Sequence, residues 1–335
     1  RVVAVATGSQ TVMQWDGLTG QYLGTLIPRG SLINPHSVTV GPDGNLYVAY
    51  GGNYTQEPSV HRYAPDGTHL GEYADLSGLS AYTVDWLTAI EFDDDGYMYV
   101  LDKGSSYGQA EVFRFERLGA ANEGAYLETF LTPATIDRPE RRLISFDMEL
   151  GPDGNLFLPS IASHDILRFK TPGGDDFGRY GEIVIGSGTI SPSNPLNYAN
   201  LIPNNNGWSF ANYFGVRPFG MDWDENGHLF VVADMLEPAF TTMRIIELDG
   251  SGNYLRDLVP LADGYSSAKT QSPFGDADFG PDGNLYVTSQ WSGEILVYGD
   301  PGGPDAGDLI AKLAMPTYVA GLESLSFIID SPGFV

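Results

Sequence analysis

The chain has 335 residues, which is enough for a large hydrophobic core, and it carries 43 Asp and Glu against 17 Lys and Arg, a formal net charge of −26 at pH 7. A charge of this size repels phosphate backbones and anionic lipid headgroups, which argues against nucleic acid and membrane surfaces as partners. The sequence contains no cysteine, which excludes disulfides, thiolate metal sites and cysteine nucleophiles.

One short phrase returns along the chain at a nearly regular interval. Three copies read Gly-Pro-Asp-Gly-Asn-Leu and two are degenerate, and their turn glycines are Gly44, Gly96, Gly154, Gly227 and Gly283. An Asp-Gly or Asn-Gly pair between short runs of β-favouring residues predicts a hairpin. The glycines are 52, 58, 73 and 56 residues apart, and a period near 50 is typical of an array of repeated units.

Each predicted hairpin is followed by two further β-like runs. A fourth strand follows the third, as residues 69–73 follow residues 59–63. Four antiparallel strands in each repeat is the composition of a propeller blade. The predicted third strands are residues 59–63, 111–115, 165–169, 243–247 and 294–298.

The two ends of the chain complement each other. A sixth turn is due near residue 333, which lies 50 residues beyond Gly283, and the strands that should follow such a turn are found at residues 1–6, 11–15 and 22–26. The sixth blade is therefore expected to take its inner strand from the C-terminal part of the chain. This closure removes the exposed sheet edges of an open array.

The sequence predicts one all-β domain over residues 1–335, a six-bladed β-propeller with four antiparallel strands in each blade. Its sixth blade is shared between about residues 1–30 and 317–333. A stretch at about residues 188–216 breaks the strand rhythm and accounts for the spacing of 73 residues. It is expected to be a loop insertion of the kind that often binds ligands.

The third strands of three blades carry an arginine followed by an aromatic residue, in Arg62-Tyr63, Arg114-Phe115 and Arg168-Phe169. Together with the hairpin phrases, this pattern resembles the NHL-type six-bladed propellers. That broad group includes gluconolactonase-like and streptogramin-lyase-like proteins. The resemblance implies the propeller fold over essentially the whole chain, but its motifs are turn and packing motifs that leave the function open.

Three acidic residues at the start of inner strands form a candidate metal site. Asp147 and Asp276 stand seven residues before their turn glycines, and Glu323 stands at the start of the sixth inner strand. Carboxylates that converge in a central channel repel one another unless a proton or a hard cation lies among them, and Ca²⁺, with Mg²⁺ as the alternative, suits such oxygen ligands. The gluconolactonase-like relatives hold a divalent metal on inner strands in a similar placement. The alternative is that these are strand-end residues hydrogen-bonded to loops. No organic cofactor is expected.

His36 is the catalytic candidate if the protein is an enzyme. It begins the first inner strand in a Pro-His-Ser sequence that is similar to the contexts of functional histidines in streptogramin-lyase-like proteins. Those proteins use more than one such histidine, whereas Thr88, Phe146 and Phe219 stand at the equivalent positions here. This departure argues against lyase activity.

The connections between strands supply the candidate ligand-binding residues. Aromatic rings stack on sugar faces, and guanidinium groups bind carboxylates in pairs of hydrogen bonds. The alternatives are that the aromatic residues pack against the propeller and that the arginines pair locally with Asp137 and Glu140. The candidates are Trp86, Arg138, Arg141, Arg142, Trp208, Tyr213 and Trp291.

Three functions are consistent with this sequence. The first is a secreted or cell-surface binding propeller, extracellular or periplasmic, that recognises a glycan or a protein through its rim and holds structural calcium; scarce lysine with many Gly, Pro and Tyr favours secretion. The second is a metal-dependent lactonase or polysaccharide lyase. The third is a structural subunit of an extracellular assembly. No nucleic-acid binding or membrane insertion is expected, and the oligomeric state stays open.

Overall fold

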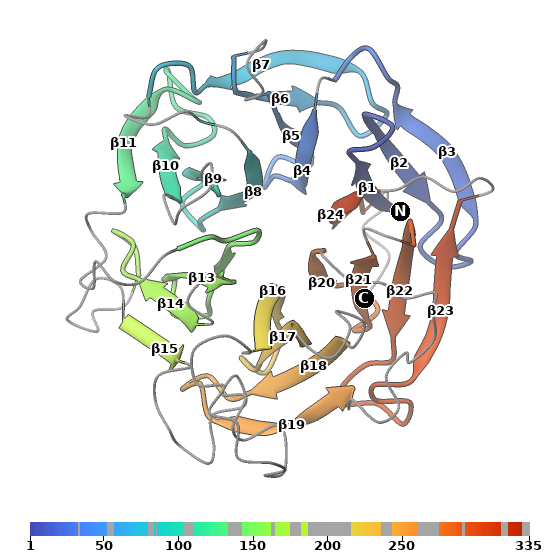
Figure 1. Ribbon diagram of the computed structural model, residues 1–335. Coiled ribbons are helices and arrows are strands. Elements are labelled where there is room, and N and C mark those ends of the chain that lie inside the picture. The colour runs from blue at the N-terminus through green and yellow to red at the C-terminus, as the bar shows by residue number, and fades with distance from the viewer. Residues whose placement is uncertain are drawn as a thin grey trace.

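The structure is a computed structural model, and its described part is composed of β-strands joined by turns (Figure 1). None of the described residues forms a helix long and apolar enough to cross a membrane. The described residues are 1–32, 34–51, 57–79, 84, 86–103, 110–132, 143–161, 165–174, 182–186, 216–235, 243–259, 275–289, 292–315 and 321–329.

The strands form six antiparallel four-stranded sheets arranged in a ring, which confirms the predicted six-bladed propeller. Blade 1 comprises β4 (Pro35–Val40), β5 (Leu46–Tyr50), β6 (Ser59–Tyr63) and β7 (His69–Asp75). Blade 2 comprises β8 (Leu87–Phe92), β9 (Met98–Asp102), β10 (Glu111–Phe115) and β11 (Tyr126–Leu131). Blade 3 comprises β12 (Glu149–Leu150), β13 (Leu156–Ser160), β14 (Asp165–Phe169) and β15 (Glu182–Gly186).

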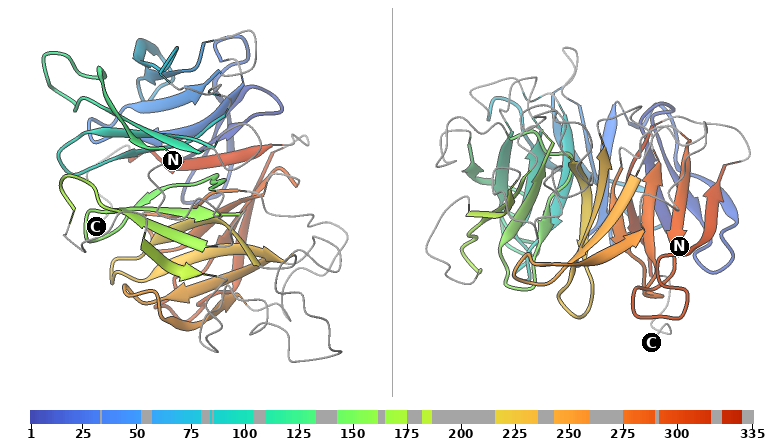
Figure 2. Two further views of the ribbon diagram at one scale, coloured as in Figure 1. Left: turned by 60° about the vertical axis from the view of Figure 1, so that its left-hand side comes forward. Right: turned by 60° about the horizontal axis from the view of Figure 1, so that its bottom comes forward.

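The remaining blades complete the ring, and side views show the strands of all blades running between the same two faces (Figure 2). Blade 4 comprises β16 (Val216–Trp223), β17 (Leu229–Met235), β18 (Met243–Leu248) and β19 (Tyr254–Val259). Blade 5 comprises β20 (Ala277–Phe279), β21 (Leu285–Ser289), β22 (Glu294–Tyr298) and β23 (Leu309–Ala314). Blade 6 comprises β24 (Leu322–Phe327), β1 (Val2–Ala6), β2 (Thr11–Trp15) and β3 (Tyr22–Ile27).

Blade 6 closes the ring as predicted, because its inner strand comes from the far end of the chain. Strand β24 pairs antiparallel with β1, with Phe327 opposite Val2 and Leu325 opposite Ala4. Backbone hydrogen bonds between Ile328 and Arg1 extend this pairing in both directions.

The repeated hairpin phrase forms the turn between the first two strands of a blade. In blade 1, Gly44 adopts a φ of 75°, a left-handed conformation that favours glycine. The Asp43 carboxylate accepts hydrogen bonds from the Asn45 side chain at 2.7 Å and from the Tyr47 hydroxyl group at 3.0 Å. The guanidinium group of Arg62 lies 3.8 Å from the same carboxylate, so the arginine of the third strand stabilises the turn of its own blade.

The hydrophobic core lies between neighbouring blades. Between blades 1 and 2 the fully buried Tyr47 packs edge-on against Phe92, with ring centroids 4.8 Å apart. Tyr73, in the outer strand of blade 1, also packs edge-on against the Tyr47 ring, with centroids 4.9 Å apart. Equivalent buried clusters lie at the other blade interfaces among the described residues. Each β-sheet is therefore covered on both faces, which fits the continuous burial of middle strands such as β5 and β9.

Inner strands of neighbouring blades are joined by side chains that bond to backbone groups. The Asp147 carboxylate accepts from the backbone N–H of Met221, 2.7 Å away in the next blade. At the ring closure, the Ser324 hydroxyl group accepts from the Val38 N–H and donates to the Val38 carbonyl, both at 3.1 Å. These contacts hold adjacent blades at their innermost edge.

Replacing Ser324 with alanine is expected to lower the free energy of unfolding by about 1–3 kcal/mol, because the buried Val38 N–H and carbonyl would lose their partner. Denaturant titration followed by tryptophan fluorescence measures the change. Ser292→Ala is the matched control, since the Ser292 hydroxyl group has no hydrogen bond among the described residues. Equal midpoints for the two variants would contradict a role for Ser324 in closure.

Candidate metal centre in the channel

Two rows of inner-strand residues contribute to the central channel. Alternate residues of a strand face the same side of the sheet. The residues seven and five positions before each turn glycine therefore both face the channel, and each position forms one row around it. Residues of both rows line a cavity of about 30 Å³ in the channel, which is space for about two water molecules. The upper row is Ser37, Ala89, Asp147, Gly220, Asp276 and Ser324, and the lower row is Thr39, Glu91, Glu149, Asp222, Asp278 and Ser326.

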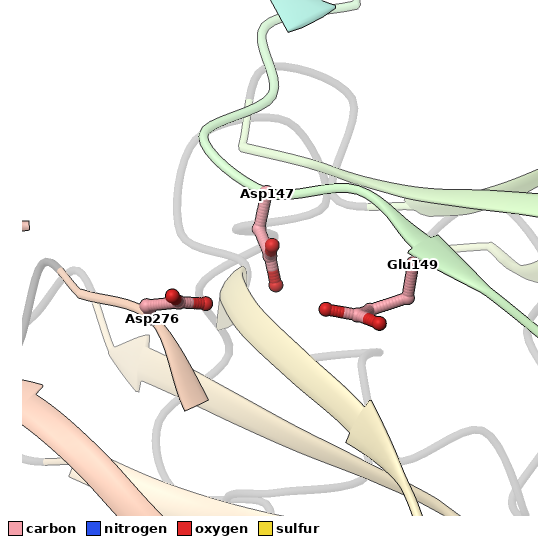
Figure 3. Close-up of side chains that lie close together, drawn as sticks. All are labelled: Asp147, Glu149 and Asp276. Atoms are coloured by element: carbon pink, nitrogen blue, oxygen red, sulfur yellow. The ribbon is translucent and has the colours of Figure 1, made fainter. Parts of the chain in front are cut away.

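Three of these residues form a compact carboxylate cluster. One oxygen atom from each of Asp147, Glu149 and Asp276 lies within 4.8 Å of the others. Figure 3 shows the three side chains pointing toward one another, from the start of blade 3 and the start of blade 5. Oxygen atoms at this separation are suitable ligands for a hard cation such as Ca²⁺.

Backbone amides fix the two aspartates of the cluster. Asp147 accepts from Met148 and Met221 through its two oxygens, at 2.8 and 2.7 Å. Asp276 likewise accepts from Ala277 and Leu325, both at 3.0 Å. These carboxylates are therefore oriented before any cation arrives, and they also connect blades 3 to 4 and 5 to 6.

The channel holds a high density of acidic groups. Burial raises the pKa of Asp276 to about 6 and the pKa of Asp222 to about 7. Burial, followed by repulsion from neighbouring carboxylates, raises the pKa of Glu91, Asp147, Glu149 and Asp278 well above their usual range. A cation would remove this repulsion, so the cluster favours either bound protons or a bound metal ion.

The structure places Glu323 outside this cluster. In β24, Phe327 lies opposite Val2 as Val40 lies opposite Leu46 in blade 1. This register puts Ser324 in the upper row and moves Glu323 one residue away. The sequence could not locate this register, because blade 6 is assembled from both ends of the chain and its turn phrase is degenerate.

Glu323 instead contacts His36. Its carboxylate lies 2.5 Å from Nδ1 of the imidazole, and the Asn34 amide nitrogen lies 2.9 Å from Nε2. With the Asn34 amide nitrogen as the donor, Nε2 accepts from Asn34 and Nδ1 donates to Glu323. His36 is 3% exposed, so its ring is held almost entirely inside the protein.

A β-bulge explains how His36 and Glu323 meet. In blade 1, Pro35 is opposite Tyr50 while Ser37 is opposite Ala49, so His36 is the extra residue of the bulge. The same irregularity occurs in β24 between the partners of Ala4 and Ala6. Bulges redirect side chains and are over-represented beside active sites.

Trp86 lies beside this pair. Its ring stacks on His36 with centroids 5.1 Å apart and an interplanar angle of 20°. The ammonium nitrogen of Lys103 lies 3.5 Å from the centroid of the same ring. Trp86 is 37% exposed, so its ring is engaged by protein groups as well as reachable from solvent. The other rim candidates, Arg138, Arg141, Arg142, Trp208, Tyr213 and Trp291, lie outside the described residues.

Sequence reasoning missed the lower acidic row. Glu91, Glu149, Asp222 and Asp278 stand five residues before their turn glycines in four successive blades. The signal was available, because a strand period of two places this row on the same side as Asp147 and Asp276.

Comparisons with known proteins bear on the fold. No protein-family model matches the chain, and no curated protein matches it. A chain in the crystal structure of a nidogen–laminin complex is 13% identical with a TM-score of 0.60, covering 98% of both chains. The periplasmic gluconolactonase of Pseudomonas aeruginosa is 14% identical with a TM-score of 0.59, also covering 98% of both. A streptogramin B lyase structure is 14% identical with a TM-score of 0.53, covering 95% of this chain and 80% of that one.

These similarities confirm the expected likeness to gluconolactonase-like and streptogramin-lyase-like propellers at the level of the fold. The same architecture occurs in a gluconolactonase and in a chain of a nidogen–laminin complex. The fold therefore leaves the chemistry to be argued from the residues in the channel and at its mouth.

In the absence of divalent cations, the unfolding midpoint is expected to fall as the pH is raised from 4 to 7. The native state retains protons on Asp276 and Asp222, whose pKa values are about 6 and about 7, while the unfolded chain releases them near pH 4. Folding is thus favoured most at low pH, and this advantage declines through both pKa values. Thermal unfolding in chelator measures the slope. Asp222→Asn should reduce the fall of the unfolding midpoint with pH. An unchanged slope would contradict a raised pKa for Asp222 in the native state.

Proposed function

We propose that this protein is a cation-stabilised binding propeller, with a divalent cation coordinated by Asp147, Glu149 and Asp276 in its channel. The observation that carries the proposal is the convergence of three carboxylate oxygens, one from each residue, within 4.8 Å of one another. The pKa of each of these carboxyl groups is raised above its usual value. The cavity of about 30 Å³ accommodates an ion and water but not a sugar ring. The cation therefore acts as a structural element.

Calcium is the preferred cation. Calcium–oxygen distances of about 2.3–2.6 Å allow opposite ligands to lie about 5 Å apart, whereas the shorter distances of Mg²⁺ allow only about 4 Å. The three carboxylate oxygens all lie within 4.8 Å of one another, which is inside the span that the ligands of a calcium ion occupy. Hydroxyl groups such as that of Ser324, which also lines the cavity, and water would complete the coordination.

The ligand of the propeller is proposed to be a glycan or a protein, bound at the end of the channel where the inner strands begin, beside His36 and Glu323. Trp86 supports this location, because its large ring is partly exposed and stacks on His36. A chain of the nidogen–laminin complex has the same fold, which supports a binding role for such a ring. The composition that favours secretion supports an extracellular or periplasmic setting, as does the periplasmic gluconolactonase of similar fold.

Calcium is expected to raise the melting temperature of the chelator-treated protein. At a free calcium concentration 100 times the dissociation constant, binding stabilises the native state by about 2.7 kcal/mol, a shift of roughly 4 °C for a domain of 335 residues. Glu149→Gln should abolish most of the shift, because it removes one ligand charge. The variant is informative since Asp147 and Asp276 also hold backbone amides of neighbouring blades.

Glu72→Gln is the matched control, because Glu72 is a half-exposed carboxylate on the outer strand of blade 1. It should leave the calcium shift unchanged. A full calcium shift in Glu149→Gln, or the same loss in Glu72→Gln, would contradict coordination by the channel cluster.

A second candidate function is a metal-dependent enzyme, favoured by the contact between His36 and Glu323. A carboxylate on Nδ1 fixes the tautomer and leaves the lone pair on Nε2, which would take a proton once the Asn34 amide moves aside. The gluconolactonase and the streptogramin B lyase of similar fold support this alternative. The bound cation would supply electrostatic stabilisation of a developing negative charge.

If the enzyme alternative holds, the protein is expected to turn over a sugar lactone or a uronate polymer, and His36→Gln should reduce the rate by about 10²–10⁴-fold, the usual contribution of a positioned base. His228→Gln is the control, since His228 pairs with Glu247 in blade 4. Turnover that is unchanged in His36→Gln would contradict a role for His36, and turnover that is undetectable in the wild type would count for the binding function instead.

A further inference from the structure

A second cavity lies where the ring closes, between the turns of blades 5 and 6. It has a volume of about 210 Å³ and is lined mostly by apolar atoms. Its walls include Tyr286 and Phe327, whose rings meet edge-on with centroids 5.0 Å apart. Asp282 from the blade 5 turn and Asp16 from the β2–β3 hairpin also line it. The cavity thus combines an aromatic interior with carboxylates from two sides.

Blade 1 shows which groups surround Asp43, the turn aspartate that is equivalent to Asp282. There Asp43 accepts from the Asn45 side chain and the Tyr47 hydroxyl group, and Arg62 lies opposite Tyr47 in the sheet. The Arg62 guanidinium group lies 3.8 Å from Asp43 and 3.1 Å from Glu123, which belongs to the β10–β11 hairpin of the next blade. One arginine therefore bridges the turn of its own blade and the hairpin of its neighbour.

Blade 5 repeats this arrangement without the arginine. Asp282 accepts from the Asn284 side chain at 2.7 Å and from the Tyr286 hydroxyl group at 3.0 Å, the same two distances as in blade 1. The residue opposite Tyr286 is Val297, a short side chain without charge. Val297 is buried in the core between blades 5 and 6, and no cationic side chain pairs with Asp282 among the described residues.

The opposite wall also carries a carboxylate. Asp16 stands in the hairpin of blade 6, as Glu123 stands in the hairpin of blade 2. Hydrogen bonds from the Thr19 backbone and hydroxyl group lower the pKa of Asp16, so it is charged at neutral pH. Arg1 also lines the cavity, but its guanidinium group donates to the Gln14 side chain and the Pro65 carbonyl.

Guanidinium groups lie against aromatic rings in the blades that contain the arginine. The Arg114 guanidinium carbon lies 4.1 Å from the Tyr97 ring centroid, and that of Arg62 lies 5.5 Å from the Tyr73 centroid. Tyr286 and Phe327 offer comparable rings in the cavity. A volume of about 210 Å³ is somewhat larger than the roughly 150 Å³ of a cavity that holds benzene, and it suits a single long side chain.

We propose that this cavity, defined by Asp16, Asp282, Tyr286 and Phe327 and called here the seam pocket, binds an arginine side chain of a partner protein. The ligand chemistry is a guanidinium group on an apolar stem, the group that blades 1 to 3 supply from their own third strands. Leu18 and Ile329 also line the pocket and are 75% and 64% exposed, so they offer apolar contact to the surface around the inserted arginine. The net charge of −26 attracts a basic partner.

The test uses a blocked arginine, N-acetyl-arginine amide, as a minimal probe, titrated into the full chain and followed by NMR or calorimetry. The neutral isostere N-acetyl-citrulline amide should bind at least about tenfold more weakly, because charge-assisted hydrogen bonds to Asp282 would be lost. N-acetyl-lysine amide should also bind more weakly, since it lacks the planar fork. Equal affinities for the three probes would overturn the proposal.

Two variants test the pocket itself. Val297→Arg places an arginine opposite Tyr286, as in blade 1, and the folded variant should lose the binding of the blocked arginine. Because Val297 is buried in the core between blades 5 and 6, circular dichroism checks that the variant folds. Asp282→Asn should weaken binding about tenfold or more. Asp43→Asn is the matched control, because the equivalent position in blade 1 is already filled by Arg62. Undiminished binding in a folded Val297→Arg protein, or equal losses in Asp43→Asn and Asp282→Asn, would overturn the proposal.

Discussion

In the described part of the chain, the inner strands of neighbouring blades belong to separate sheets, and side chains satisfy several of their backbone amides around the channel. Asp147, Asp222 and Asp276 do this for blades 3 to 6, each accepting from an amide in the following blade. Ser324 and Ser326 do it for the closure between blades 6 and 1. The ring is thus joined on one side by carboxylates and on the other by hydroxyl groups, and the carboxylate side concentrates negative charge in a confined space.

This concentration of charge connects architecture to function. Amide hydrogen bonds favour the ionised form of each aspartate, while burial and mutual repulsion oppose it. A divalent cation satisfies both demands, because it neutralises the carboxylates without removing them from their amides. The contact between His36 and Glu323 lies beside this region, since the Asp276 N–H donates to the Glu323 carbonyl at 3.2 Å. A binding function and a catalytic function would therefore depend on the same inner framework.

Much of the fold was predictable because the turn phrase carries its own geometry. The Asp-Gly pairs located the hairpins, and the complementary ends located blade 6. The site was predictable only in part. Asp147 and Asp276 follow directly from alignment on the turn glycines, but the environment of Glu323 depends on a bulge and on the register of β24, which local sequence does not encode. The six rim candidates from Arg138 to Trp291 lie outside the described residues and stay predictions. The seam pocket was invisible to motif reasoning, because its signal is an absent arginine in an otherwise conserved pattern within the chain.

The most direct test of the account is a crystal structure of the protein grown with calcium, with anomalous diffraction recorded to locate the ion. The account predicts one anomalous peak in the channel, within about 2.3–2.6 Å of oxygen atoms of Asp147, Glu149 and Asp276. A channel that contains only water between these three side chains in calcium-saturated crystals would contradict it.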